Sequence, residues 1–413
     1  MATAFLVLSA LGLLACLNTL RPVRWTPLVL PSFFTAWLTA ELAPQLVVLT
    51  VGGTAAFGLL GGWTGWQGRV GLGLTLLAML VLMRLILAAE QAAGVADRAL
   101  AAYPEEAGSG PEPTSLLRRF FVPMAFSHPD VERLVDLPYS PHSSRHRLDV
   151  YRHKDHPSGC PTLVQVHGGG WVIGDKREQG RPLMLHLASR GWVCVAPNYR
   201  LSPKATFPDH LVDVKRALAW VRQHGPEYGA DPGFVVITGG SAGGHLAALA
   251  ALTPNDPRYQ PGFEQADTSV AGCVPYYGVY DLVGETGTAA ATWRRRRLLE
   301  RLVFKSKDPA LLTEASPLSH VHADAPAFLV IHGANDTLAP VAEARLLVAR
   351  LRAVSRQPVL YLELPGTQHA FDVFPSIRSA HVVRAAGRFL EQLRRNSVRP
   401  PGPAPSPAAG QGP

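Results

Sequence analysis

A glycine-rich hexapeptide, GGSAGG at residues 239–244, separates a strand-like run from a helix-like run. Residues 234–237 before it read FVVI, and residues 245–250 after it read HLAALA. A sharp strand-to-helix turn that carries a serine is typical of a nucleophile elbow, in which small neighbours leave the hydroxyl clear of the sheet. The pattern predicts Ser241 as a nucleophile, although G-x-S-x-G also occurs in turns with no catalytic role. The hexapeptide has neither the Lys-Ser/Thr pair of a phosphate loop nor dinucleotide-binding spacing.

Beyond about residue 140, short apolar runs alternate with longer amphipathic stretches. We expect strands near residues 161–166, 191–196, 234–238, 270–276, 327–332 and 358–364, with an outer strand at Arg145 to Tyr151. We expect helices near residues 178–190, 207–223, 241–252, 339–353 and 376–394. This alternation predicts an α/β fold with a mostly parallel sheet flanked by helices.

A serine hydroxyl needs a base within hydrogen-bond reach and a third group that orients the base. In an α/β-hydrolase these groups follow in the order serine, acid, histidine. Asp336 and His369 each follow a strand-like run in that order, and we predict them as the orienting acid and the general base. The nearest competitors are His332, which precedes the acid, and Asp372, which follows the base, so neither matches the order.

Three consecutive glycines follow an early strand. Attack by a serine on a carbonyl creates an oxyanion, and each backbone N–H that stabilises it contributes roughly a few kcal/mol. We predict an oxyanion hole formed by Gly168, Gly169, Gly170 and the N–H of Ala242. Glycines let the backbone approach the substrate closely. The alternative is a flexible turn.

With these motifs together, residues 140–395 resemble the hormone-sensitive-lipase-like branch of α/β-hydrolase esterases. The resemblance rests on the elbow, the acid and base loops, and the motifs HGGG at 167–170, NYRLSP at 198–203, FP at 207–208 and Asp213. It implies hydrolysis of carboxylic esters through an acyl-enzyme, without a metal or organic cofactor. It also implies structural roles for Tyr199, Arg200 and Pro203. Some membrane-bearing actinobacterial esterases have a similar layout, which implies a bacterial origin.

Trp171 departs from the family pattern, because many lipase-like members carry Phe after the glycines. Related formamidases and feruloyl-type esterases can also have an aromatic residue there. An amide or formamide hydrolase therefore stays an alternative to an esterase that acts on a small or lipid ester. A membrane scaffold that has kept the fold without turnover is a further alternative.

The first 92 residues form the second predicted unit, a transmembrane helical region. Apolar stretches of membrane-spanning length lie at about residues 3–19, 42–63 and 69–89. Residues 26–40 contain proline and are predicted as a fourth segment, a re-entrant helix or an interfacial helix. A cleaved signal peptide is disfavoured, because no Lys or Arg precedes the first apolar stretch and further spans follow it.

Charge predicts how the spans are oriented. Three spans leave only Arg69 outside and place the other flanking arginines in the cytoplasm with the catalytic domain: Arg21, Arg24, Arg98, Arg118 and Arg119. The net charge of +8 suits a surface near anionic lipid. No basic stripe with interleaved aromatics is present, so we expect a lipid bilayer and no nucleic acid as partner.

The remaining segments are predicted from composition. Residues 93–139 are expected to form a linker and, at 114–135, a cap. Residues 294–297 are four arginines in an insertion that either rests on the membrane or forms a solvated helix over the sheet. Residues 396–413 are rich in Pro, Gly, Ala and Ser and are expected to be disordered. The four cysteines have no CxxC spacing, so neither a zinc site nor a disulfide framework is predicted.

Overall fold

The computed structural model describes residues 1–24, 27–103, 127–287, 297 and 299–398. Most of the predicted cap, Arg294 to Arg296 of the arginine run, and the tail from residue 399 lie outside the described residues.

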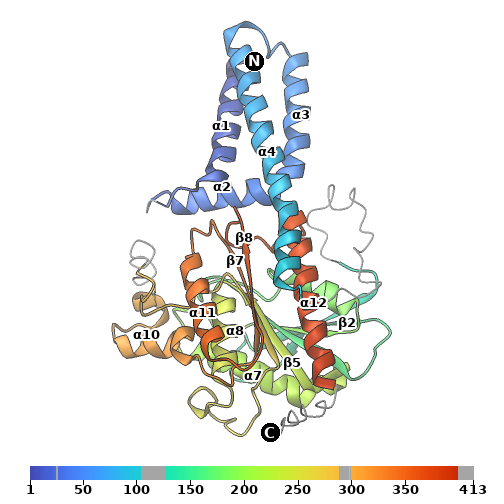
Figure 1. Ribbon diagram of the computed structural model, residues 1–413, viewed down its shortest axis with the longest axis vertical. Coiled ribbons are helices and arrows are strands. Elements are labelled where there is room, and N and C mark those ends of the chain that lie inside the picture. Colours follow the sequence, from blue (N-terminus) through green and yellow to red (C-terminus); the bar gives the residue numbers. More distant parts are fainter. Residues whose placement is uncertain (25–26, 104–126, 288–296, 298, 399–413) are drawn as a thin grey trace, which may run out of the picture.

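One mixed sheet forms the centre of the part of the chain after residue 127, which we call the catalytic region after its predicted function (Figure 1). Its strands lie in the order β1-β2-β4-β3-β5-β6-β7-β8. β2 pairs antiparallel with both β1 and β4, and all other neighbours pair in parallel. The strands are β1 (Val131–Pro138), β2 (Arg147–His153), β3 (Cys160–Val166), β4 (Val193–Pro197), β5 (Ala230–Gly240), β6 (Gly272–Tyr276), β7 (Ala327–Gly333) and β8 (Val359–Leu364). The predicted α/β class with a mostly parallel sheet is confirmed.

Strand β1 lies within the segment that composition assigned to a linker. It is one of the two edge strands and pairs only with β2, and none of its side chains is fully buried. Its sequence, VERLVDLP, therefore lacks the continuous apolar run that marks the central strands.

Helices cover both faces of the sheet. They are α6 (Arg181–Ala188), α7 (Asp209–His224), α8 (Ala242–Leu252), α10 (Pro309–Ala315), α11 (Val341–Val354) and α12 (Ile377–Val398). α7, α8 and α11 belong to one buried apolar cluster, whereas α6 and α12 belong to a second cluster on the opposite face. Short 3₁₀ turns at Gly225–Tyr228, Pro257–Tyr259 and Pro317–His320 and a π-helical turn at Leu299–Val303 complete the described elements.

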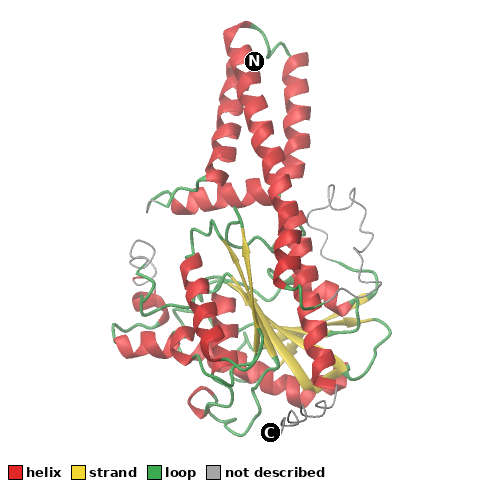
Figure 2. Cartoon of the chain, viewed as in Figure 1, coloured by secondary structure: helices red, strands yellow, loops and turns green. Residues whose placement is uncertain are grey.

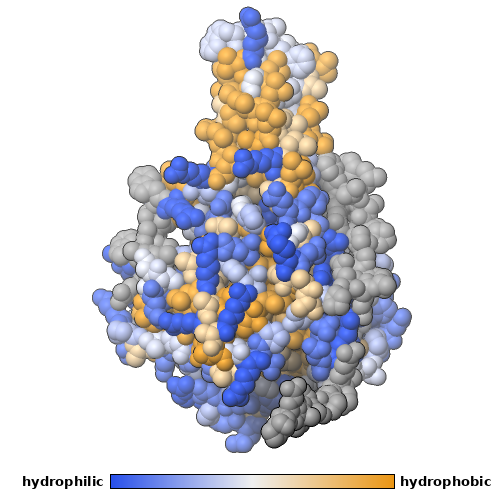
Figure 3. Space-filling model, in the orientation of Figure 1, coloured by the Kyte–Doolittle hydropathy of each residue, from blue (hydrophilic) through white to orange (hydrophobic). Residues whose placement is uncertain are grey.

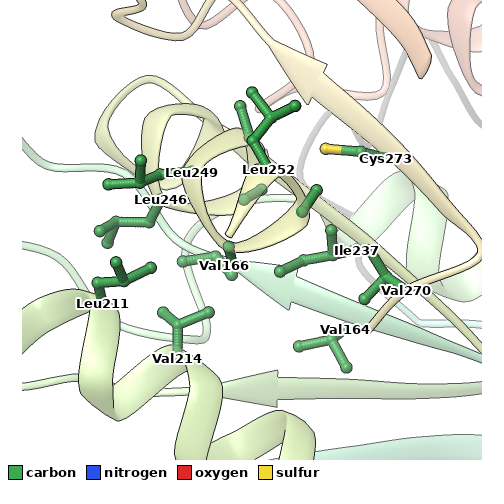
Figure 4. Close-up of a cluster of buried hydrophobic side chains, with 14 of the residues drawn as sticks. Val164, Val166, Leu211, Val214, Ile237, Leu246, Leu249, Leu252, Val270 and Cys273 are labelled. Carbon is green, nitrogen blue, oxygen red and sulfur yellow. The ribbon is translucent and has the colours of Figure 1, made fainter. Parts of the chain in front are cut away.

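Helix α8 lies in the interior directly after the elbow. Figure 4 shows Leu246, Leu249 and Leu252 of α8 close to Val166 of β3 and Ile237 of β5. Every residue of α8 is buried. Burial of a whole side chain of this size contributes roughly 1.5–3 kcal/mol, so this packing fixes α8 and the turn that precedes it.

Four helices precede the sheet: α1 (Ala2–Leu20), α2 (Val29–Glu41), α3 (Ala43–Leu59) and α4 (Gly65–Ala99). α1, α3 and α4 rise from the catalytic region as a bundle, and α2 lies across its base (Figure 2). α1 and α4 are long and apolar enough to cross a membrane, and α2 with α3 counts as a third candidate that is bent by 87°. Figure 3 shows an apolar bundle surface above a mostly polar catalytic region.

The bundle is joined to the catalytic region at its base. Ala92, Ala96 and Leu100 near the end of α4 are buried in the same apolar cluster as α12. The Arg388 guanidinium of α12 donates to the carbonyls of Leu100 and Tyr103 at 3.1 and 2.6 Å. The end of α4 is therefore part of the catalytic core as well as of the bundle.

Candidate active site

Ser241 occupies the turn between β5 and α8. Its backbone φ of 59° and ψ of −122° are unusual for a non-glycine residue, as expected of a strained elbow. The turn is held by the N–H of Ser241, which donates to the Tyr276 carbonyl at 3.0 Å, and by the N–H of His245, which donates to the Ser241 carbonyl at 2.9 Å. Ser241 itself is only partly buried.

The glycine two residues after Ser241 is required by close packing. A Cβ added at Gly243 would lie 2.1 Å from the Val166 carbonyl oxygen and 2.6 Å from the His167 carbonyl oxygen. No side chain fits there without moving the backbone of β3. The small residues of the elbow therefore allow α8 to start directly against the neighbouring strand.

Asp336 lies in the loop after β7, and its carboxylate is buried. Oδ1 accepts the backbone N–H groups of Leu338 and Ala339, both at 2.8 Å, and Oδ2 faces His369. Burial favours a raised pKa for Asp336. However, the charge of His369 and hydrogen bonds from His332 and His369 bring this pKa below its ordinary value. Asp336 therefore stays ionised at neutral pH.

His369 lies in the loop after β8 and is also buried. Its Nδ1 lies 2.6 Å from Oδ2 of Asp336, and because an ionised carboxylate only accepts, Nδ1 is the donor. The backbone N–H of His369 donates to Oε1 of Gln368 at 2.9 Å. These contacts fix the imidazole and leave Nε2 as the nitrogen that can take a proton.

Sequence order alone did not single out Tyr277, which contacts the His369 ring. The two ring centroids are 4.5 Å apart, and the Tyr277 hydroxyl donates to Asp372. Burial raises the pKa of Asp372 to about 6, against the opposing effect of that hydrogen bond. Thus Asp372, the competing acid, pairs with Tyr277, whereas Asp336 pairs with His369.

The loop that contains the three glycines lies beside the elbow. A Cβ at Gly168 would lie 2.7 Å from the Gly240 carbonyl oxygen. The N–H of Gly168, however, donates to Oε1 of Gln179 at 2.7 Å, so this group is already engaged. Within the described part of the chain, the N–H groups of Gly169 and Gly170 have no such acceptor. Of the three glycines, this leaves Gly169 and Gly170 as candidate oxyanion donors.

The residues around this loop hold its backbone in place. His167 stacks on Tyr199, and the Tyr199 hydroxyl donates to the His167 carbonyl at 3.0 Å. Burial lowers the pKa of His167 to about 4, so its ring is neutral at physiological pH. Trp171 donates its indole N–H to Nδ1 of His245 in α8 at 3.3 Å. Arg200 forms an ion pair with buried Asp213 at 2.8 Å.

The predicted site residues therefore gather at the carboxyl ends of β3, β5, β7 and β8. Asp336 and His369 are directly hydrogen-bonded, whereas among the described residues no hydrogen bond joins the Ser241 hydroxyl to His369. Tyr277 lies between the serine elbow and the Asp336–His369 pair. A Cβ added at Gly240 would lie 2.7 Å from the Tyr277 hydroxyl, and the Tyr277 ring contacts His369. Catalytic hydrogen bonds are often long in unliganded enzymes and tighten with substrate.

Comparison with known proteins shows which proteins this chain resembles. Residues 148–351 match the family model described as BD-FAE. The chain is 52% identical over 276 residues to the probable carboxylic ester hydrolase LipM of Mycobacterium tuberculosis, which covers 65% of this chain and 64% of that protein. It is 48% identical over 260 residues to esterase LipQ of the same organism, and this match covers 62% of this chain and 61% of LipQ. The chain thus spans less than two thirds of these relatives.

A solved structure resembles the catalytic region. The butyrate-bound esterase Est2 of the Planctomycetes species Thermogutta terrifontis has a TM-score of 0.54 and 25% identity, and the match covers 64% of this chain and 95% of that chain. Together with the sheet order, these likenesses support the expected resemblance. In sequence and in fold, the chain is similar to the α/β-hydrolase esterases and lipases of the hormone-sensitive-lipase-like type.

Proposed function

We propose that this protein is a membrane-anchored serine hydrolase that cleaves carboxylic esters. Ser241 is the nucleophile, His369 the general base and acid, and Asp336 the group that orients the imidazole. The observation that carries the proposal is the buried Asp336–His369 hydrogen bond at the carboxyl edge of the sheet that also carries the Ser241 elbow. The esterase names of LipM and LipQ support the same chemistry.

The reaction proceeds in two stages. The Ser241 Oγ attacks the ester carbonyl carbon while its proton passes to Nε2 of His369, and the tetrahedral intermediate then breaks its bond to the alcohol oxygen. His369 returns the proton to that oxygen, and the alcohol leaves. Water next attacks the acyl carbon and gives a proton to His369. The bond from that carbon to Oγ breaks, the proton returns to Oγ, and the acid is released.

The oxyanion of each intermediate needs preorganised donors. We assign this role to the N–H groups of Gly169 and Gly170 with that of Ala242, the first residue of α8. Gly168 is not assigned this role, because its N–H donates to Gln179. Its lack of a side chain instead lets the glycine loop lie close to Gly240 of the elbow. Removing one such donor typically costs about 10²–10³ in rate.

The helices before the sheet are assigned to the membrane. α1, α3 and α4 expose large apolar side chains along the bundle, among them Leu11, Leu49 and Leu80. Water exposure of such a surface is unfavourable, and lipid removes that cost. Figure 1 shows that the C-terminal end of α1 lies at the base of the bundle near the catalytic region, and Arg21 caps that end. This arginine favours a cytoplasmic site by the positive-inside rule.

A covalent probe and a matched substrate pair test the proposal. A fluorophosphonate should label the detergent-solubilised protein on Ser241, located by peptide mass spectrometry, and labelling should vanish in Ser241→Ala. The protein should also hydrolyse 4-nitrophenyl butyrate faster than butyryl 4-nitroanilide. A faster anilide would favour the amide hydrolase, and absence of labelling on folded protein would favour the non-catalytic scaffold.

A further inference from the structure

Helix α2 lies against the loop that holds the general base. The Trp37 indole N–H donates to the carbonyl of Ala370, the residue after His369, at 2.9 Å. The Phe33 ring lies 6.2 Å from the His369 ring in an edge-on arrangement, and Trp37 stacks on Phe374 at 5.0 Å. One face of α2 therefore forms part of the wall around the imidazole.

The end of α2 is held by a buried ionic contact. Glu41 forms an ion pair with Arg378 at the start of α12, and both side chains are buried. Glu41 also accepts the Ser376 hydroxyl at 2.6 Å. These contacts, with those of Phe33 and Trp37, tie α2 to the chain between His369 and α12.

The opposite face of α2 is apolar and uncovered. Leu30, Phe34 and Leu38 recur every four residues, so they share one side of the helix, and their exposed fractions are 55%, 51% and 40%. A soluble protein usually places polar residues on such a face. α2 thus has one apolar side against the catalytic region and a second with no cover among the described residues.

The geometry of the bundle indicates what covers this face. α2 meets α3 at 87°, and α3 is one of the helices with exposed apolar side chains. A helix at right angles to a span lies in the plane of the membrane surface. The 17 residues of α3 rise about 26 Å, close to the roughly 30 Å hydrocarbon thickness, so α2 falls at its boundary. Continuity with the bundle therefore favours lipid over a protein partner.

We propose that α2 is an interfacial helix that forms the lipid-facing wall of the active site. Its stripe of Leu30, Phe34 and Leu38 rests among the acyl chains of one leaflet, while Phe33 and Trp37 border His369. The substrate class that fits is an ester whose long acyl or alkyl chain resides in the bilayer and reaches Ser241 along α2. This inference rests on the proposed esterase function and adds the source of the substrate.

Vesicle assays on the full chain test the proposal. The protein is reconstituted in phosphatidylcholine vesicles, and its rates are compared on dissolved 4-nitrophenyl acetate and bilayer-borne 4-nitrophenyl palmitate. The test variant carries Leu30→Gln, Phe34→Gln and Leu38→Gln, because glutamine keeps helix propensity while removing apolar contact. The matched control carries Val135→Gln, Val283→Gln and Val354→Gln, at positions of the catalytic region with exposed fractions of 52%, 47% and 46%.

We expect the ratio of palmitate to acetate turnover to fall by about tenfold or more in the α2 variant, as for loss of an interfacial anchor. The control variant should keep the wild-type ratio. If wild type hydrolyses both esters and the α2 variant keeps the ratio, this inference is wrong and the esterase proposal stands. If folded wild type hydrolyses neither ester, the esterase proposal fails and this inference with it.

A depth measurement gives an independent readout that needs no turnover. A nitroxide label on Phe34→Cys in vesicles should collide more with oxygen than with a water-soluble nickel complex, and a label on Val354→Cys should show the reverse. Labels that are equally open to the nickel complex would place the α2 stripe in water and overturn the proposal.

Discussion

Nδ1 of His369 donates to Oδ2 of Asp336 at 2.6 Å, with both side chains buried. The other carboxylate oxygen is held by two backbone N–H groups of the same loop. Asp336 is therefore fixed from one side and fixes the imidazole from the other. This relationship sets the orientation and the tautomer that a serine hydrolase needs.

Asp336→Asn should lower kcat by about 10³–10⁴-fold with little change in KM, because an amide favours the wrong imidazole tautomer. Steady-state kinetics on a soluble 4-nitrophenyl ester measures this effect. Asp372→Asn serves as the comparison, since Asp372 pairs with Tyr277, and its loss should stay below about tenfold. A larger loss in Asp372→Asn than in Asp336→Asn would show that the acid has been misassigned.

Asp372 should make stability depend on pH in the direction opposite to a usual carboxylate. Burial raises its folded pKa to about 6, above its unfolded value. Between about pH 4 and pH 6 the folded state then binds more protons, so stability falls as pH rises through this window. Asp372→Asn should remove this loss and raise stability at pH 7.5, by about 3 kcal/mol at most. Unfolding at pH 4.5 and 7.5 checks this, and an equal effect at both values would contradict it.

Gly170→Ala should reduce kcat/KM by roughly 10²-fold, because the new Cβ projects beside a proposed oxyanion donor. Gly170 has a φ of 59°, and its added Cβ would meet only Val172 Cγ2 at 4.0 Å. Gly262→Ala is the matched control, with a φ of 77° and no atom within 4 Å of the added Cβ. Both changes cost about 1–2 kcal/mol of stability. Equal activity in the two variants would argue against a role for Gly170.

Arg378→Met should destabilise the protein by about 3–5 kcal/mol, because Glu41 would remain as a buried charge without a partner. Adding Glu41→Gln should recover most of that loss. Arg356→Met, which breaks an exposed ion pair with Asp324, should change stability by less than about 1 kcal/mol. Thermal unfolding in detergent compares the three variants. Similar shifts in Tm for Arg356→Met and Arg378→Met would contradict a stabilising role for the buried Glu41–Arg378 pair.

Local pattern predicted most of the fold. The central strands are fully buried and read as apolar runs, and the helices between them repeat with helical period, so both are visible in the sequence. β1 was missed because an edge strand with half-exposed side chains has neither signal. The elbow and the strand ends likewise depend on residues near in sequence, which is why Ser241, Asp336 and His369 could be proposed before the structure.

Contacts between residues far apart in the sequence could not be predicted from local patterns. Trp37 and Ala370 are 333 positions apart, and the position of α2 depends on packing that no periodicity records. For the same reason, the sequence did not distinguish whether residues 26–40 form a fourth segment, a re-entrant helix or an interfacial helix. The engagement of the Gly168 N–H by Gln179 and the contact of Tyr277 with His369 also arise from tertiary packing.

The most direct test of Ser241 as the nucleophile is hydrolysis of 4-nitrophenyl esters from acetate to palmitate by detergent-solubilised protein, with Ser241→Ala measured in parallel. We expect turnover by the wild type and a fall of about 10⁴–10⁶-fold in the variant, with both proteins folded. Equal rates for the two proteins, or no turnover of any ester by folded wild type, would contradict the assignment of Ser241 as the nucleophile of an esterase.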